Sequence, residues 1–181
     1  NDHGFTAFLS DGVIPYVGVS PRSGASVIRV ADTSGGAFSN FGVAGNGGVS
    51  MNNLNEVAFV GQRLINISQL TRDVFVGDVS GRQPIPAVTR GEVIDAATFG
   101  SVAQNGFEAQ SMNNKGQIAF YATIQRGSTN RAVILRADPV EGVSPGNPIM
   151  PAPGSSMPSG WRFTLTCQQS PALCARGVRR Y

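Results

Sequence analysis

Two ten-residue segments of this chain have nearly the same sequence, and a shorter variant opens the chain. Residues 50–59 read SMNNLNEVAF, residues 111–120 read SMNNKGQIAF and residues 1–8 read NDHGFTAF. Together they give the pattern Asn-x-x-Gly-x-x-Ala-Phe three times, with starts 51 and then 61 residues apart. A period near 50 residues is typical of propeller blades or solenoid coils. The repeat therefore predicts one small structural unit built three times.

Each copy of the motif predicts a tight turn followed by a strand. Asn opens a turn by bonding its side chain to backbone further on, and Gly three residues later suits the left-handed conformation that closes a type I turn with a bulge. The second copy has Asn at that place, the next most tolerant residue. The motif positions are Asn1, Gly4, Ala7, Phe8, Asn52, Asn55, Ala58, Phe59, Asn113, Gly116, Ala119 and Phe120.

The strand after each turn carries a small and a large residue on opposite faces. In the third copy, Phe120 shares a face with Ile118, Ala122 and Ile124, while Ala119 lies on the other face. This alternation predicts that sheets stack on both sides of the strand and that the motif residues pack in the core.

Further segments repeat with the motif. Residues 26–32, 73–78 and 132–138 predict a second strand that ends in Asp, and Asn46-Gly47 and Asn105-Gly106 predict hairpin turns. Each unit then holds about four short strands, as a propeller blade does. The sequence therefore predicts an all-β fold of tandem four-stranded antiparallel units, foremost a partial β-propeller, with a β-solenoid or an irregular β-sandwich as alternatives.

The segment between the second and third copies has a weaker pattern. Residues 84–99 predict one or two extended pieces around Arg90-Gly91. Residues 91–99 are the best candidate for a helix, but the pattern is short.

Composition divides the chain into three parts. Residues 1–143 form the predicted β-repeat domain, with units that start near 1, 52 and 113. Residues 144–160 form a Pro/Gly/Ser-rich linker, and we expect residues 161–181 to be a disordered basic tail. Four of the 14 basic residues lie in that tail, so the net charge of +3 falls to −1 for residues 1–161. No basic stripe crosses the repeat domain, which argues against a nucleic-acid partner.

The motif resembles the tandem Asn-x-x-Gly-x-x-Ala-Phe repeats of secreted bacterial surface proteins, over about residues 1–150. Asn55 departs from the pattern. The resemblance implies a β-rich, propeller-like array that is extracellular or at the bacterial cell surface, in a family without an assigned activity. It transfers no catalytic residue to this chain.

The tail is similar in part to PEP-CTERM sorting segments. Pro-Ala-Pro-Gly at 151–154 is followed some twenty residues later by an arginine cluster, but Arg162, Gln168, Gln169 and Pro171 interrupt the apolar span between them. Two interpretations stay open, a degenerate or frame-shifted sorting tail and an ordinary disordered tail. Cys167 and Cys174 are expected to be free or bridged to each other, not metal ligands.

Candidate chemistry is sparse. Residues 142–146 (GVSPG) match a nucleophile-elbow pattern, but Pro145 follows Ser144 and no His lies downstream, so a turn is expected. Asp32, Asp78 and Asp138 are candidate calcium ligands, for which turn capping is the stronger interpretation. His3 is expected to be an exposed turn residue. No catalytic residue, cofactor or metal is predicted.

Three functional hypotheses follow. The first is a non-enzymatic extracellular module for structure, adhesion or recognition, with a cell-surface protein or polysaccharide as partner. The second is a carbohydrate-binding propeller module, and the third is a fragment of a secreted hydrolase. Open sheet edges invite pairing, so missing repeats or self-association are expected to complete the fold.

Overall fold

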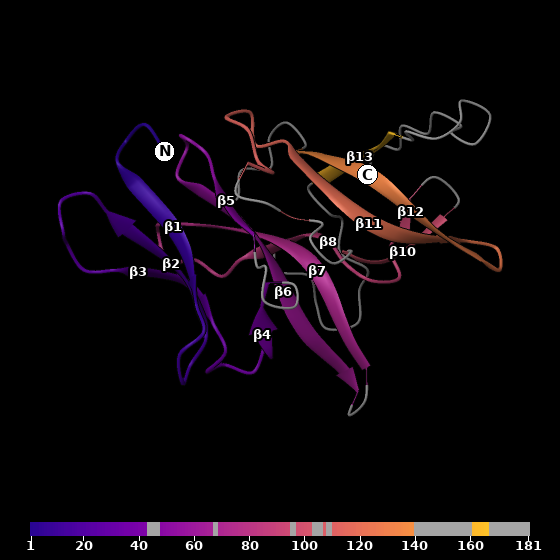
Figure 1. Ribbon diagram of the computed structural model, residues 1–181, viewed down its shortest axis with the longest axis horizontal. Helices are drawn as coiled ribbons and strands as arrows, with labels where there is room; N and C mark the ends of the chain where they lie inside the picture. The colour runs from indigo at the N-terminus through magenta and orange to yellow at the C-terminus, as the bar shows by residue number, and fades with distance from the viewer. Residues whose placement is uncertain are drawn as a thin grey trace.

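The structure, a computed structural model, describes residues 1–42, 48–66, 69–94, 97–102, 107, 110–139 and 161–166 (Figure 1). These residues form three sheets and no helix, and every strand pair is antiparallel. The predicted all-β class is confirmed.

The sheets follow one another along the chain. The first sheet holds β1 (Phe5–Ser10), β2 (Tyr16–Pro21) and β3 (Ile28–Asp32). The second sheet holds β4 (Asn40–Phe41), β5 (Val49–Met51), β6 (Glu56–Asn66), β7 (Gln69–Asp78) and β8 (Ile85–Val88). The third sheet holds β9 (Val93–Ile94), β10 (Ala97–Val102), β11 (Ile118–Arg126), β12 (Thr129–Pro139) and β13 (Trp161–Thr166).

The strand that follows each motif turn pairs with the next strand in a hairpin, β1 with β2, β6 with β7 and β11 with β12. Residues 73–78 and 132–138 therefore lie in second strands, as predicted. Residues 26–32 do not, because β2 takes that place and β3 comes third. The short β2, which contains Gly18, had no pattern strong enough to reveal it.

The strand count also differs from four per unit, since the sheets have three, five and five strands. Residues 84–99 supply β8 to the second sheet and begin the third sheet with β9 and β10. The helix suggested at residues 91–99 is wrong where the structure describes it, because β9 and β10 pair with each other. Asn46-Gly47 and Asn105-Gly106 lie outside the described residues.

The end of the chain adds a strand to the third sheet. Trp161–Thr166 forms β13 and pairs with β12, whereas we expected a disordered tail from residue 161. The linker at 144–160 and residues 167–181 lie outside the described residues.

The second sheet lies between the other two, and β6 is buried on both of its faces. Val57, Ala58, Phe59 and Val60 all have 0% exposure. Phe59 and Val57 pack with residues of the first sheet, while Ala58 and Val60 pack with residues of the third, including Phe120. The Phe face of each motif strand thus meets the Ala face of the preceding one, and the predicted stacking on both sides holds for the middle unit.

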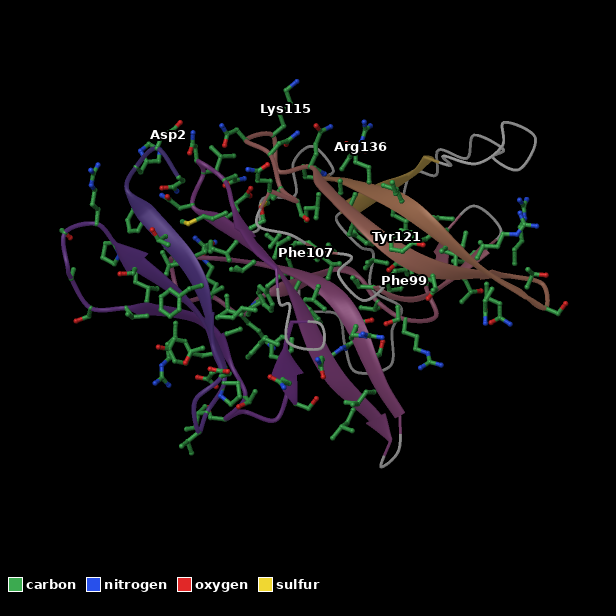
Figure 2. The ribbon with its side chains drawn as sticks, in the orientation of Figure 1. Asp2, Phe99, Phe107, Lys115, Tyr121 and Arg136 are labelled. Carbon is green, nitrogen blue, oxygen red and sulfur yellow. The ribbon has the colours of Figure 1, made fainter. Side chains whose placement is uncertain are left out.

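The two outer sheets are covered on one face only. Ala119 and Tyr121 are exposed, and Phe8 is half-buried. Figure 2 labels Tyr121 on the third sheet. Two-sided burial is therefore wrong for β1 and β11, because no described sheet lies beyond them.

One outward position of the third sheet is charged where the second sheet has a buried apolar residue. Arg136 is the register partner of Ala119, at the place where Val76 pairs with Ala58.

Candidate functional site

The three motif turns have the same backbone geometry. The φ angle is 79° at Gly4, 64° at Asn55 and 73° at Gly116, which is the left-handed region expected from the sequence. The N–H of each of these residues donates to the carbonyl oxygen of the Asn that opens its turn, at 3.1, 3.3 and 3.0 Å. Asn55 is the only residue other than glycine with a positive φ in the part of the chain that the structure describes.

The opening Asn side chains stabilise their own turns. The Oδ1 atom of each accepts the N–H of the residue four positions on, at 3.0 Å for Asn1, 3.0 Å for Asn52 and 3.1 Å for Asn113. This bond satisfies a backbone donor at the start of the strand. The motif Asn is therefore a structural residue in all three copies.

The turns also bond to one another and form a row, here called the turn row (residues 1–4, 52–55 and 113–116). The N–H of Asp2 donates to Oδ1 of Asn53 at 2.9 Å, and the N–H of Asn53 donates to Oδ1 of Asn114 at 2.9 Å. The Asn53 amide also bonds the Asp2 carboxylate. Figure 2 shows Asp2 and Lys115, from the first and third turns, along one edge of the molecule.

Two more contacts tie the turn row together. The Asn1 amide donates to the carbonyl oxygen of Asn52 at 2.9 Å and to Oδ1 of Asn55 at 3.0 Å. Beside the third turn, the N–H of Met112 donates to Oγ of Ser50 at 2.9 Å, in a buried bond. The repeated segment Ser-Met-Asn-Asn contains residues that make these bonds. The sequence analysis did not predict that these residues link neighbouring sheets.

The three candidate calcium ligands hold turns and side chains instead of meeting one another. Oδ1 of Asp32 accepts the N–H of Ser34 at 2.9 Å, and Oδ1 of Asp78 accepts the N–H of Ser80 at 2.7 Å. Asp138 accepts from Gln117 and Arg136 at 2.6 and 3.1 Å. The described residues contain no group of three or more His, Cys, Asp or Glu that could hold a metal ion.

Hydrogen bonds favour the charged form of the Asp32 carboxyl group. The Ser34 hydroxyl and the Ser34 N–H stabilise the carboxylate, and nearby Arg29 adds to them, so the pKa of Asp32 is lowered from its usual value of 3.8.

Asp73 is a buried charge that the sequence analysis did not single out. It is 0% exposed, and it accepts from Nε of Arg63 at 3.0 Å, from Oγ1 of Thr71 at 2.9 Å and from the N–H of Arg90 at 2.9 Å. The Arg63 Nη2 atom completes the ion pair. Asp73 thereby fixes the Arg90-Gly91 turn to β7, which is a structural role.

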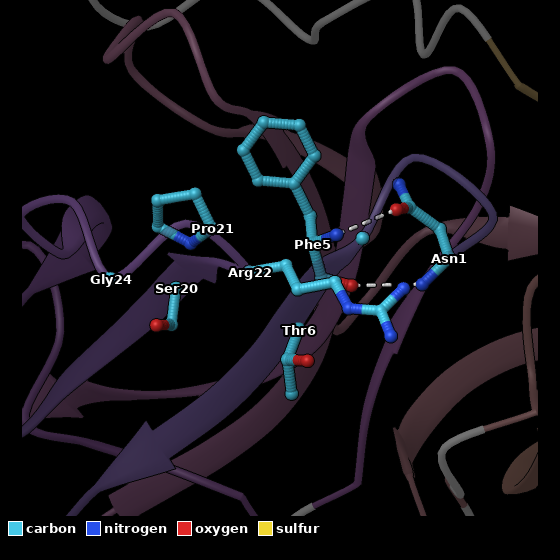
Figure 3. A pocket seen from close by; sticks show the side chains of 8 residues that line it. Asn1, Phe5, Thr6, Ser20, Pro21, Arg22 and Gly24 are labelled. Atoms are coloured by element: carbon cyan, nitrogen blue, oxygen red, sulfur yellow. Dashed lines mark hydrogen bonds between the residues drawn. The ribbon is translucent and has the colours of Figure 1, made fainter.

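A shallow hollow of about 520 Å³ lies on the first sheet beside the first turn (Figure 3). Thr6, Ser20 and Arg22 line it with polar groups. The Arg22 stem lies across Gly4, where a Cβ atom would stand 3.0 Å from Cβ of Arg22. Figure 3 shows the Arg22 guanidinium reaching toward Asn1.

An aromatic pair continues the same outer face. The rings of Phe8 and Tyr16 meet edge to face with centroids 5.9 Å apart, and the guanidinium of Arg29 lies 4.8 Å from the Tyr16 centroid. Among the described residues, the hollow and this pair form a polar and aromatic surface on one continuous sheet face.

Of the other sequence candidates, only His3 can be placed relative to this surface. His3 is exposed in the first turn, as expected. Ser144, Cys167 and Cys174 lie outside the described residues, so the structure does not place the GVSPG segment or the cysteine pair. In the described part of the chain, no helix combines the length and hydrophobicity needed to span a membrane.

The chain matches no protein-family model, no curated protein and no solved structure.

Proposed function

We propose that this chain is a non-enzymatic structural and recognition module of an extracellular or surface-located bacterial protein. The turn row carries the proposal, because the polar atoms that the sequence repeats bond to one another and hold three sheets together. Polar groups that bond to one another within the fold have a structural role. The resemblance of the motif to secreted bacterial repeat proteins supports the location and a propeller-like assembly.

The proposal is tested on the purified chain in two assays. A fluorescently labelled chain is expected to show saturable retention on bacterial cells or on surfaces coated with extracellular polysaccharide. In parallel, a panel of chromogenic esters and glycosides is expected to hydrolyse no faster than in buffer. Hydrolytic activity that co-elutes with the chain in gel filtration, together with no retention on any surface, would contradict the proposal. That result would favour the hydrolase fragment.

Carbohydrate binding is the second candidate, and the outer face of the first sheet favours it. Recognition of sugars combines hydroxyl and charged side chains with an accessible ring, and the hollow with its adjoining Phe8 and Tyr16 supplies these groups. A polysaccharide is thus the partner that this surface fits best. Among the described residues, no further sheet lies over this face of the first sheet (Figure 1).

A further inference from the structure

We propose that the outer face of the first sheet binds an acidic polysaccharide, with Arg22 recognising the carboxylate of a sugar. This inference rests on the recognition function proposed above and names its ligand class. It follows from the side chains that this face carries at positions where the other two sheets have buried apolar residues.

Matching positions of the three sheets show which residues differ in the first sheet. The motif Phe lies opposite Gly18 in the first sheet, opposite Phe75 in the second and opposite Leu135 in the third. Two residues before the motif Phe, the second and third sheets have buried aliphatic residues. The first sheet has Thr6 there, with Ser20 as its register partner. The first sheet keeps the motif ring, Phe8, beside these polar residues.

The Phe8 ring lies directly over Gly18, which has no side chain. A Cβ atom on Gly18 would stand 2.7 Å from Cζ of Phe8, so the ring occupies the space above that glycine. Tyr16 closes the same position with its ring, 2.9 Å from that Cβ at Cε2. The two rings offer a rigid apolar surface with a polar edge, which suits the C–H face of a sugar.

Arg22 supplies the charge. Its aliphatic stem packs on Gly4, which limits the positions of the guanidinium. No carboxylate of the described residues forms an ion pair with it, whereas Arg29 is engaged by Asp32 at 3.9 Å and by the Tyr16 ring. A guanidinium binds a carboxylate through two parallel hydrogen bonds. The paired hydroxyls of Thr6 and Ser20 both donate and accept, as recognition of sugar hydroxyls requires.

A sugar fits this surface better than an acidic peptide does. Extended peptides bind sheets by adding a strand to an open edge, and the edges of the first sheet are β1 and β3. The hollow lies on the face of β1 and β2, where no unpaired backbone ladder is offered.

The test measures binding of oligogalacturonate to the whole chain by calorimetry, with its methyl ester and a polyglutamate peptide as competing probes. We expect the acid to bind and the ester and the peptide to bind at least tenfold more weakly. Arg22→Gln is expected to weaken acid binding about tenfold, the usual loss for one charge-assisted contact at a half-open site. Arg22→Lys is expected to bind the acid with an affinity between those of the unsubstituted chain and Arg22→Gln.

Arg131→Gln is the matched control, because it removes the same charge from an exposed position on β12. It is expected to leave the affinity unchanged, and circular dichroism checks that every variant is folded. Equal losses in both variants, no loss in either, or equal binding of acid and ester would overturn the inference. Preferential binding of polyglutamate would do the same. If the chain is still retained on cells while oligogalacturonate fails to bind, the recognition function stands and only this ligand class is rejected.

Discussion

The backbone N–H of Asn53 donates a 2.9 Å hydrogen bond to the side-chain oxygen of Asn114, 61 residues further along the chain. The two residues hold the same place in successive copies of the motif. Asp2 makes the equivalent bond to Asn53. The repeated residues therefore both shape each turn and bond it to its neighbour, which explains why the second Asn of the repeated segment recurs although it makes no core contact.

Ser50→Ala is expected to destabilise the fold. Ser50 is 1% exposed and accepts the buried N–H of Met112, so the substitution leaves that donor without its acceptor and costs about 1–3 kcal/mol of unfolding free energy. Urea denaturation measures the change. Ser39→Ala, at an exposed serine that bonds the Gln62 carbonyl at 3.1 Å, is the control and is expected to cost less than about 0.5 kcal/mol. Equal costs would argue against the bond to Met112.

Asn55→Ala and Asn55→Gly are expected to differ in stability. Alanine is strained at a φ of 64°, by about 1–2 kcal/mol, whereas glycine is not. Both variants lose the bond from the Asn1 amide, so their difference isolates the backbone conformation. In thermal unfolding, the glycine variant is expected to have the higher melting temperature. An alanine variant as stable as the glycine variant would show that residue 55 is not left-handed.

Asp73→Asn is expected to lower the free energy of unfolding by about 3 kcal/mol, because breaking a buried ion pair from one side leaves its partners unsatisfied. Asp78→Asn changes the same chemical group at a turn on the same strand and is expected to cost about 1 kcal/mol. Urea denaturation compares the two variants. If Asp73→Asn costs no more than Asp78→Asn, the carboxylate does not anchor the Arg90-Gly91 turn.

Asp32 is expected to titrate below 3.8, because hydrogen bonds from Ser34 favour its charged form. A carboxyl whose pKa is lower in the folded state contributes stability above its unfolded pKa, and that contribution is lost as the pH falls through the folded value. The loss is therefore confined to pH values below about 4. NMR titration is expected to show the Asp32 midpoint rising in Ser34→Ala. An unchanged midpoint would remove Ser34 as the cause.

The sequence predicts what depends on local backbone chemistry. The all-β class, the left-handed positions and the hairpin after each turn follow from Asn, Gly and alternation at fixed spacing. Other features depend on contacts between distant residues. Pattern alone could not show that Ala119 is exposed while Ala58 is buried, because the sequence around both is alike and only the neighbouring sheet differs.

The candidate surface could not be predicted from the sequence either. Arg22 enters the hollow because its stem packs on Gly4, and Phe8 takes its place because Gly18 has no side chain. Phe8 and Gly18 lie on paired strands, and Gly4 and Arg22 lie just outside the ends of the same two strands. The sequence analysis could not pair them, since it passed over β2. Asp73 was missed for a similar reason, because its partner N–H at Arg90 lies 17 residues away.

Amide hydrogen exchange of Asn53 and Met112 tests the turn row most directly. Both N–H groups are expected to be protected, since their acceptors are side chains from a neighbouring unit. Asn114→Ala is expected to remove protection at Asn53 alone, and Ser50→Ala to remove it at Met112 alone. Exchange of both amides at unprotected rates in the unsubstituted chain would contradict the claim that the three turns are bonded into one row.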